Sequence, residues 1–196
     1  MNNGLVITGG GGWFGRAFLA NVAADPLPFD EVRVFVNQPS DVALVQQELP
    51  QAHIYVGDVR SDSDVTEVFE GLDRHLLVHA AGVIHPAQVS DFFAVNADGT
   101  ERVVRTAIKN GLDRMVHVSS NSPIGTNPSP DETFRDNEPY NPYFGYGESK
   151  MRAEIAVREL LTDAGVPGTI VRPPWFYGPY QPERQARFLK TVRLGK

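Results

Sequence analysis

The sequence predicts an α/β fold in which helices cover both faces of a doubly wound parallel sheet. Short apolar runs alternate with helical patterns along the chain, and the runs are continuous rather than alternating in polarity. Such alternation is typical of a parallel sheet, and strands buried on both faces read as unbroken apolar runs. A third observation is the cluster of glycines between the first apolar run and the first helical pattern.

The individual elements follow in regular order. We expect strands over Leu5–Thr8, Val32–Val36, His53–Val56, Leu76–His79, Arg114–Ser120 and Gly168–Pro173. We expect helices over Trp13–Ala24, Val42–Leu49, Ser63–Glu70, Ser90–Asn110, Tyr143–Ala164 (ended by Gly165) and Glu183–Leu194. A proline-rich loop occupies residues 123–142. The pattern predicts one domain over residues 1–174, with only the start of a second region over residues 175–196.

Composition narrows the class of protein. The 196 residues are 41% hydrophobic, enough for one domain with a core. The net charge of -6 and the lack of a basic block argue against a nucleic-acid partner. There is no cysteine, which favours a reducing compartment. No apolar run approaches the roughly 20 residues that a bilayer requires, and no secretory signal stands at the N-terminus. We therefore predict a cytoplasmic protein with no membrane segment.

The glycine cluster "TGGGGWFG" has the G-x-x-G-x-x-G spacing of a phosphate-binding turn. Gly9 permits a tight turn out of the strand, Gly12 lets the backbone approach a pyrophosphate, and Gly15 lets the helix pack closely. The helix N-terminus adds free N–H groups and a positive dipole end. The context of strand and helix favours a dinucleotide site over a flexible linker. The expected contact residues of this turn are Gly9, Gly12, Trp13, Phe14 and Gly15.

The choice between NAD and NADP stays open at this point. An acid at the end of the second strand would favour NAD, and a basic residue would favour NADP. The strand ends in "FVNQ", and Asn37 can hydrogen-bond a ribose hydroxyl without repelling a 2′-phosphate. Arg33 lies within the strand, and we expect its side chain to point away from the cofactor.

A tyrosine and a lysine stand four residues apart in "YGESK", on one face of the predicted helix. A tyrosine has an ordinary pKa of about 10, and a nearby cation favours the phenolate. Lys150 can therefore lower the pKa of Tyr146 and also reach a cofactor ribose. Ser119 and Ser120 end the fifth strand, where ligands of open α/β sheets bind. Taken singly, the pair could be a solvated helix start and the serines could be turn residues.

Taken together, the glycine turn, Ser120, Tyr146 and Lys150 resemble the short-chain dehydrogenase/reductase superfamily, in particular its extended, epimerase/dehydratase-like branch. The resemblance covers nearly all of the chain and implies a Rossmann fold. Seven motifs agree in order: "TGGGGWFG", "GDVR", "HAAG", "VNADGT", "SSNSPIG", "DETFRDNEPYNPYFGYGESK" and "RPPWFYGP".

The resemblance implies a role for each matching residue. Tyr146 is the general base or acid, Lys150 lowers its pKa and holds the ribose, and Ser120 orients the substrate oxygen. The cofactor supplies hydride transfer at its nicotinamide. Further cofactor contacts are implied for Asp58 at the adenine, with Val59 beside it, and for the backbone of Ala80, Ala81 and Gly82 at the nicotinamide ribose. The resemblance also implies a buttress role for Asn96 and a cofactor contact for Pro173. Substrate contacts are implied for His85, Ser122 and Trp175.

Three functions are compatible with these features. The favoured one is an NAD(P)-dependent epimerase or dehydratase acting on a secondary alcohol or ketone of a nucleotide sugar. Trp175 stands where sugar-nucleotide epimerases often carry asparagine, so a hydroxysteroid-dehydrogenase-like alcohol dehydrogenase or reductase is the alternative. A non-catalytic dinucleotide sensor is a third reading. Members of the branch continue into a substrate domain that is largely missing here, so the activity of this chain alone stays open. The branch also implies a homodimer formed through helices 90–110 and 143–164.

The five histidines do not form a metal site, because no ligand spacing is present. We expect His79 and His117 to be buried, hydrogen-bonded core residues on central strands. His53 and His75 are expected at strand edges, and His85 near the site.

Overall fold

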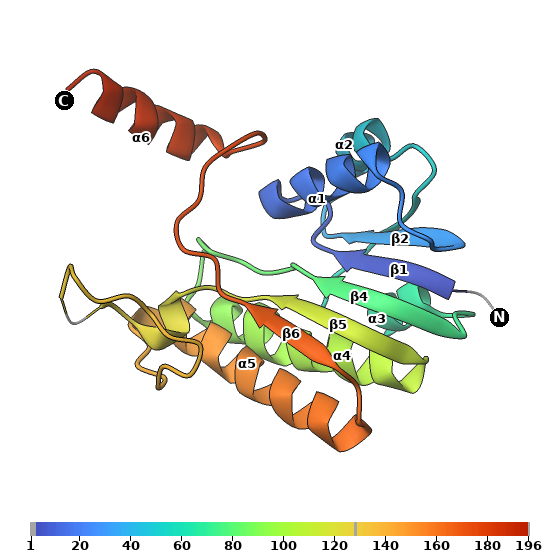
Figure 1. Ribbon diagram of the computed structural model, residues 1–196. Coiled ribbons are helices and arrows are strands. Elements are labelled where there is room, and N and C mark those ends of the chain that lie inside the picture. The colour runs from blue at the N-terminus through green and yellow to red at the C-terminus, as the bar shows by residue number, and fades with distance from the viewer. Residues whose placement is uncertain (1–2, 128, 196) are drawn as a thin grey trace.

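The computed structural model describes residues 3–127 and 129–195, and it confirms the α/β fold. Six parallel strands form one sheet in the order β3-β2-β1-β4-β5-β6 (Figure 1). Every neighbouring pair in this sheet runs in parallel. The strands are β1 (Asn3–Thr8), β2 (Glu31–Val36), β3 (His53–Val56), β4 (Arg74–His79), β5 (Leu112–Val118) and β6 (Gly168–Val171).

The helices lie close to their predicted positions. They are α1 (Trp13–Ala24), α2 (Asp41–Glu48), α3 (Asp62–Phe69), η1 (Phe92–Gly99), α4 (Thr100–Lys109), η2 (Ser122–Ile124), α5 (Phe144–Ala164) and α6 (Glu183–Arg193). The expected strand over residues 114–120 lies at 112–118, so the serine pair follows β5 directly. The Ser119 N–H still donates to the Val171 carbonyl at 2.8 Å, which extends the pairing with β6 one residue beyond the end of β5.

The single helix expected over residues 90–110 is in fact two elements. A π-helix, η1, leads directly into α4. Apolar periodicity does not distinguish a π-helix from an α-helix, and π turns occur often at functional sites. The π-helix η1 contains the buried Asn96 and ends at Gly99. Gly99 packs so closely against Val59 that an added Cβ would lie 2.7 Å from Val59 Cγ2.

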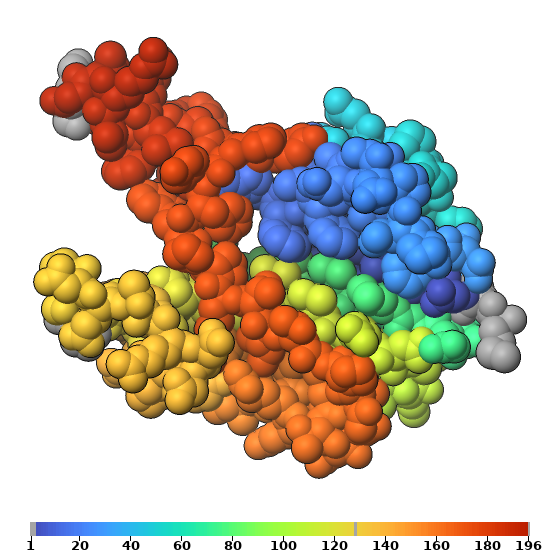
Figure 2. Space-filling view, viewed as in Figure 1, coloured from blue at the N-terminus to red at the C-terminus, as the bar shows by residue number. Residues whose placement is uncertain are grey.

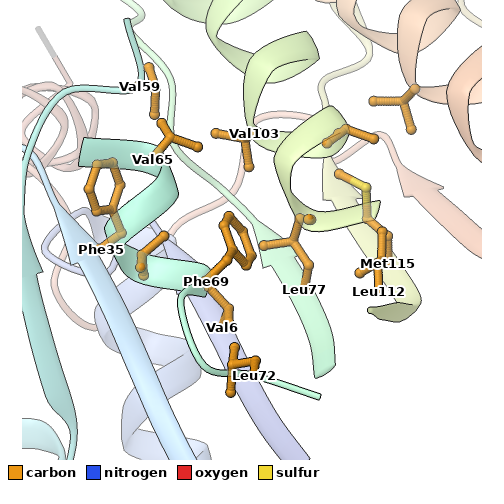
Figure 3. Close-up of a cluster of buried hydrophobic side chains, with 14 of the residues drawn as sticks. Val6, Phe35, Val59, Val65, Phe69, Leu72, Leu77, Val103, Leu112 and Met115 are labelled. Atoms are coloured by element: carbon orange, nitrogen blue, oxygen red, sulfur yellow. The ribbon is translucent and has the colours of Figure 1, made fainter. Parts of the chain in front are cut away.

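The sheet separates two hydrophobic clusters. Helices α3, α4 and α5 cover one face, and α1 and α2 cover the other (Figure 1). The alternation along β1 shows the division, because Val6 belongs to the first cluster while Leu5 and Ile7 belong to the second. Figure 3 shows the larger cluster, whose labelled members are Val6, Phe35, Val59, Val65, Phe69, Leu72, Leu77, Val103, Leu112 and Met115.

The C-terminal segment leaves the body of the domain after β6. Helix α6 stands away from the sheet, and none of its residues is buried (Figures 1 and 2). The strands and the helices that pack on them therefore lie within residues 3–171. The assignment of residues 175–196 to a second region stays a prediction. Among the described residues, no helix is long and apolar enough to cross a membrane.

The histidine predictions have mixed outcomes. His79 is fully buried and lies between the Thr8 and Thr100 hydroxyls, at 2.6 and 2.9 Å, as expected. His117 is buried as well and stacks on His79, but its ring nitrogens have no hydrogen-bond partner among the described residues, so that part of the prediction is wrong. His75 is also fully buried, against Phe69, rather than at a strand edge, because β4 is a central strand. His53 lies exposed on the edge strand β3, as expected.

Candidate functional site

The glycine turn joins β1 to α1 with no side-chain hydrogen bond to the helix N-terminus. Gly12 caps α1, and no acidic residue lies in the first turn. Gly9 has a φ of +74°, and an added Cβ would lie 2.7 Å from the Ala81 backbone nitrogen. A Cβ on Gly15 would lie 2.3 Å from the Gly9 carbonyl oxygen, whereas one on Gly12 would meet only that oxygen, at 3.3 Å. The turn therefore needs glycine at 9 and 15 for its shape, while Gly12 borders open space.

This difference predicts two distinct outcomes for alanine substitutions. Gly15→Ala forces a methyl group against the Gly9 carbonyl, and overpacking of this kind destabilises by about 1–3 kcal/mol. A Cβ at Gly12 would approach only the Gly9 carbonyl oxygen, and the φ of Gly12 is ordinary for any residue. Gly12→Ala should therefore lower the free energy of unfolding by less than about 1 kcal/mol. Urea unfolding of both variants measures the free energy of unfolding. Equal losses in the two variants would contradict this description of the turn.

Trp13 and Phe14 have side chains that are already engaged elsewhere. The Trp13 indole N–H donates to the Pro179 carbonyl at 2.5 Å, and its ring packs on Phe176 with centroids 4.3 Å apart. Phe14 packs against Phe18 on the cluster beneath α1. Only the backbone N–H groups of these two residues lie at the helix N-terminus. Their assignment as cofactor contacts therefore rests on the backbone and stays a prediction.

The end of β2 borders the same turn, because the Gly9 N–H donates to the Phe35 carbonyl at 2.9 Å. Arg33 is buried and donates to the carbonyls of Val68 and Glu70 at 3.1 and 2.7 Å, so it points away as expected. Asn37 is exposed and accepts from Gln38 at 2.8 Å. Sequence reasoning missed Asp41, at the start of α2, whose Oδ2 would lie 2.5 Å from a Cβ on Gly11. An acid is thus present at the glycine turn, five residues after the end of β2.

Asp58 and Val59, after β3, have different environments. The Arg60 guanidinium donates to both Asp58 carboxylate oxygens, at 2.6–3.0 Å, and this contact holds the pKa of Asp58 below its ordinary value. Val59 is a member of the larger core cluster and packs against Gly99. The Val59 side chain therefore faces the core, and a cofactor contact at this residue would have to come from its backbone.

The segment after β4 is held by two buried side chains. The Ala81 N–H donates to the Thr8 hydroxyl at 3.2 Å, and the Val83 N–H donates to the Asn96 amide oxygen at 2.8 Å. Asn96 Nδ2 donates in turn to the Val83 carbonyl and to Ser149 Oγ, at 3.0 and 3.1 Å. Asn96 is fully buried, so it supports this segment rather than facing the cofactor directly.

The serine, tyrosine and lysine predicted from the sequence come together at the end of β5. The Ser120 hydroxyl lies 3.0 Å from Ser122 Oγ and hydrogen-bonds the Tyr146 phenol. Lys150 Nζ donates to the Val118 carbonyl at 2.9 Å, and it would lie 3.7 Å from a Cβ on Gly82. The segment after β4, the end of β5 and the first turns of α5 therefore meet at one place.

The electrostatics of this cluster differ from the expectation. Burial raises the pKa of Tyr146 above its ordinary value, and the hydrogen bond to Ser120 acts in the opposite direction. We expected Lys150 to lower the pKa of Tyr146. The Lys150 ammonium group is instead directed to the Val118 carbonyl, and it does not contribute to the shift of that pKa. Burial also lowers the pKa of Lys150 to about 8, while the Glu154 carboxylate acts to raise it.

The three residues with implied substrate contacts are not all brought to this cluster. Ser122 is buried and lies next to Ser120. His85 Nε2 lies 2.6 Å from Arg184 Nη1, and Trp175, which is 70% exposed, packs on Phe188. Both partners belong to α6, so these two contacts connect the outer loops with the C-terminal helix. The described residues contain no group of three or more His, Asp or Glu that could hold a metal ion.

Sequence reasoning also missed Glu154, which is fully buried next to the serine pair. Its carboxylate accepts from Ser119 Oγ at 2.6 Å and from the Arg172 guanidinium at 2.6–3.1 Å. A signal was present, because Tyr146, Lys150 and Glu154 are spaced by four and so share one face of α5.

The chain is similar to known proteins over nearly all of its length. The model of the NAD dependent epimerase/dehydratase family matches residues 5–194. The uncharacterized protein y4nL of Sinorhizobium fredii is 39% identical over an alignment of 201 positions that covers 98% of this chain and 56% of that protein. N-acetyl-alpha-D-glucosaminyl-diphospho-ditrans,octacis-undecaprenol 4-epimerase of Escherichia coli O157:H7 is 28% identical over an alignment of 204 positions that covers 100% of this chain and 56% of that protein.

A solved structure shows the same similarity. The dTDP-glucose 4,6-dehydratase DesIV of Streptomyces venezuelae, a double mutant with NAD bound, superimposes with a TM-score of 0.81 and 29% identity. The match covers 97% of this chain and 62% of that structure. The chain therefore spans little more than half the length of the curated relatives named above.

Proposed function

Because the chain belongs to the NAD-dependent epimerase/dehydratase family, we propose that it forms the cofactor-binding and catalytic part of an epimerase or dehydratase that acts on a nucleotide sugar. The observation that carries this proposal is the meeting of Ser120, Tyr146 and Lys150 beside the segment after β4. Three elements far apart in the sequence bring together a hydroxyl, a phenol and an ammonium group. That set is suited to moving a proton on and off a secondary alcohol.

The glycine turn fits a dinucleotide on two grounds. Gly12 borders open space at the N-terminus of α1, where unpaired N–H groups and the helix dipole favour a pyrophosphate. Asp41 lies against Gly11, and Arg33, the cation within β2, is turned away. A carboxylate here would repel the 2′-phosphate of NADP, so we propose that NAD is preferred. Asn37 and Asp58 are the proposed partners of the adenosine half.

The proposed chemistry assigns one task to each side chain. When bound, the cofactor accepts and returns the hydride at its nicotinamide ring. The Tyr146 phenolate takes the proton of the substrate hydroxyl, and Ser120 donates a hydrogen bond to the same oxygen. Lys150 offers a positive charge next to the segment that would hold the ribose. Burial raises the pKa of Tyr146, and the hydrogen bond with Ser120 acts against this rise and so favours the phenolate.

The nucleotide-sugar substrate is supported by the relatives. The Escherichia coli relative is a 4-epimerase of a diphospho-linked sugar, and the Streptomyces venezuelae relative is a dTDP-glucose dehydratase. We propose that residues 175–196 begin the region that contacts this substrate, with Trp175 and His85 in its wall and Ser122 and Pro173 nearer the reacting groups. We also propose a homodimer through α4 and α5, which lie side by side on one face of the sheet (Figure 1).

One observation favours a second candidate, a dehydrogenase or reductase of an apolar alcohol. Trp175 and Tyr177 expose large aromatic surfaces where a nucleotide-sugar site would require polar groups. An apolar alcohol such as a steroid would fit such a wall.

The two candidates are separated by the fate of the cofactor. The longest reading frame that contains residues 1–196 is incubated with NAD and a panel of nucleotide sugars, and absorbance at 340 nm is followed alongside sugar products. An epimerase or dehydratase converts the sugar without net NADH. Stoichiometric NADH with an apolar alcohol, and no sugar conversion, would contradict the favoured function. Binding of NAD without turnover of a nucleotide sugar or an apolar alcohol would instead indicate a sensor. Calorimetric titration with NAD and NADP tests the cofactor preference.

A further inference from the structure

Glu154 is the centre of a buried polar cluster that the proposed chemistry does not use. Its carboxylate accepts hydrogen bonds from Ser119, Tyr140 and Arg172, at distances of 2.6–3.1 Å. These partners come from the end of β5, the loop before α5 and the residue after β6. Glu154 thereby ties three segments to the middle of α5. A cavity of about 940 Å³ lies beside this cluster, and Arg172 forms part of its wall.

The same carboxylate also faces a second cation. Lys150 lies one turn earlier on α5 and is buried, and Glu154 is the one carboxylate whose charge acts on it. The other titratable groups near Lys150 are Tyr146 on α5, His79 on β4 and His117 on β5. Burial keeps both histidines neutral at physiological pH. The Glu154 carboxylate is therefore paired with the Arg172 guanidinium, and its charge also acts on the Lys150 ammonium one turn away.

We propose that Glu154 is a positioning residue, which holds the Ser119–Ser120 end of β5 against α5 and balances the positive charge of Lys150. The inference rests on the proposed function, because it assigns a support to the Ser120, Tyr146 and Lys150 cluster. A carboxylate buried only to stabilise the fold needs a partner cation, and Arg172 satisfies that need by itself. The additional bond to Ser119, next to Ser120, and the spacing of four from Lys150 connect Glu154 to the reacting groups.

The charge-balancing role predicts opposite shifts in two variants. The chain has four lysines, at 109, 150, 190 and 196, so the side-chain ¹³Cε signal of Lys150 can be assigned and titrated by NMR. Glu154→Gln removes the negative charge, and the titration midpoint of Lys150 should fall by at least about 1 pH unit. Arg172→Gln removes a competing cation and leaves the carboxylate, so the midpoint should rise. Glu159→Gln, on the exposed side of α5, should leave it unchanged.

If Glu154 served only to pair with Arg172, and its charge did not act on Lys150, Glu154→Gln would leave the midpoint of Lys150 unchanged. If Glu154→Gln fails to fold, Arg172→Gln alone carries the test. An unchanged midpoint in Arg172→Gln, or shifts of the same sign in both variants, would overturn the proposal.

The positioning role is tested in the full-length protein. Glu154→Gln should lower kcat at least tenfold with KM changed less than threefold, since Ser120 and Lys150 are displaced while the outer contacts stay. A rise in KM with an unchanged kcat would contradict the positioning role of Glu154. The NMR titration needs neither cofactor nor turnover. If the protein fails to bind NAD, the proposed function is rejected, but the titration still decides whether Glu154 balances the charge of Lys150.

Discussion

Replacement of Tyr146 by phenylalanine is expected to lower turnover by about 10³-fold while NAD affinity changes less than about threefold. The substitution removes only the phenol oxygen, and positioned acid–base groups contribute about 10²–10⁴-fold to rate. The ring packs against Phe92 with centroids 5.9 Å apart, and phenylalanine preserves that contact. Steady-state kinetics of the full-length protein measure turnover, and calorimetric titration measures the dissociation constant of NAD.

A matched tyrosine provides the control. Tyr143 stands three residues earlier, at the N-terminal end of α5, and is exposed. Tyr143→Phe should keep the kcat of the unmodified protein. Full activity in Tyr146→Phe would reject the acid–base role of this residue. Loss of NAD binding together with turnover would show that the phenol supports the cofactor site rather than the chemical step.

The second large effect is a loss of stability in mild acid, caused by three buried histidines. Burial lowers the pKa of His75 to about 4 and that of His79 to about 3, and it holds the pKa of His117 well below the ordinary 6.5. Between pH 6.5 and about 4, the unfolded chain binds more protons than the native one. Stability is therefore complete above pH 6.5 and is lost as the pH falls.

The size of this loss follows from proton linkage. At pH 5 His75 and His79 each remove about 2 kcal/mol, about 4 kcal/mol together, and His117 adds a loss of the same sign. Small domains have a total stability of about 5–15 kcal/mol, so the domain should lose a large share of its stability by pH 5. Urea unfolding at pH 7.5, 6 and 5 measures the free energy at each pH.

A pair of histidine variants tests the attribution. His117→Leu removes a ring whose nitrogens have no hydrogen-bond partner among the described residues, so it should lessen the loss of stability between pH 7.5 and 5. His53→Leu, on the exposed edge strand, should leave that loss as it is. The same acid sensitivity in both variants would mean that other groups are responsible.

Local sequence patterns predicted the strands of the fold, and at the candidate site they predicted the glycine turn and the tyrosine–lysine pair. The apolar runs predicted all six strands, and the glycine spacing predicted the turn whose shape depends on Gly9 and Gly15. The spacing of four predicted that Tyr146 and Lys150 share a face of α5. These features are encoded within a few residues of one another, so they are readable without the fold.

Features that depend on distant partners could not be read in this way. The wider turns of η1 and the burial of His75 depend on what packs against them, and the indole of Trp13 is held by Pro179, far along the chain. Asp41 reaches Gly11 only because α2 folds back beside the glycine turn.

The sequence by itself determined the order of strands and helices, the glycine turn and the tyrosine–lysine pair, because each depends on spacing along one segment. Only the tertiary structure decided the environment of those groups. Burial raises the pKa of Tyr146, and Glu154 joins Ser119 to Arg172, because the ends of β5, β6 and the middle of α5 meet in space. The charge and hydrogen bonding of a site arise from contacts between segments that are far apart in the sequence. Residue spacing within one helix shows which residues share a face, but it does not show which distant residues they contact.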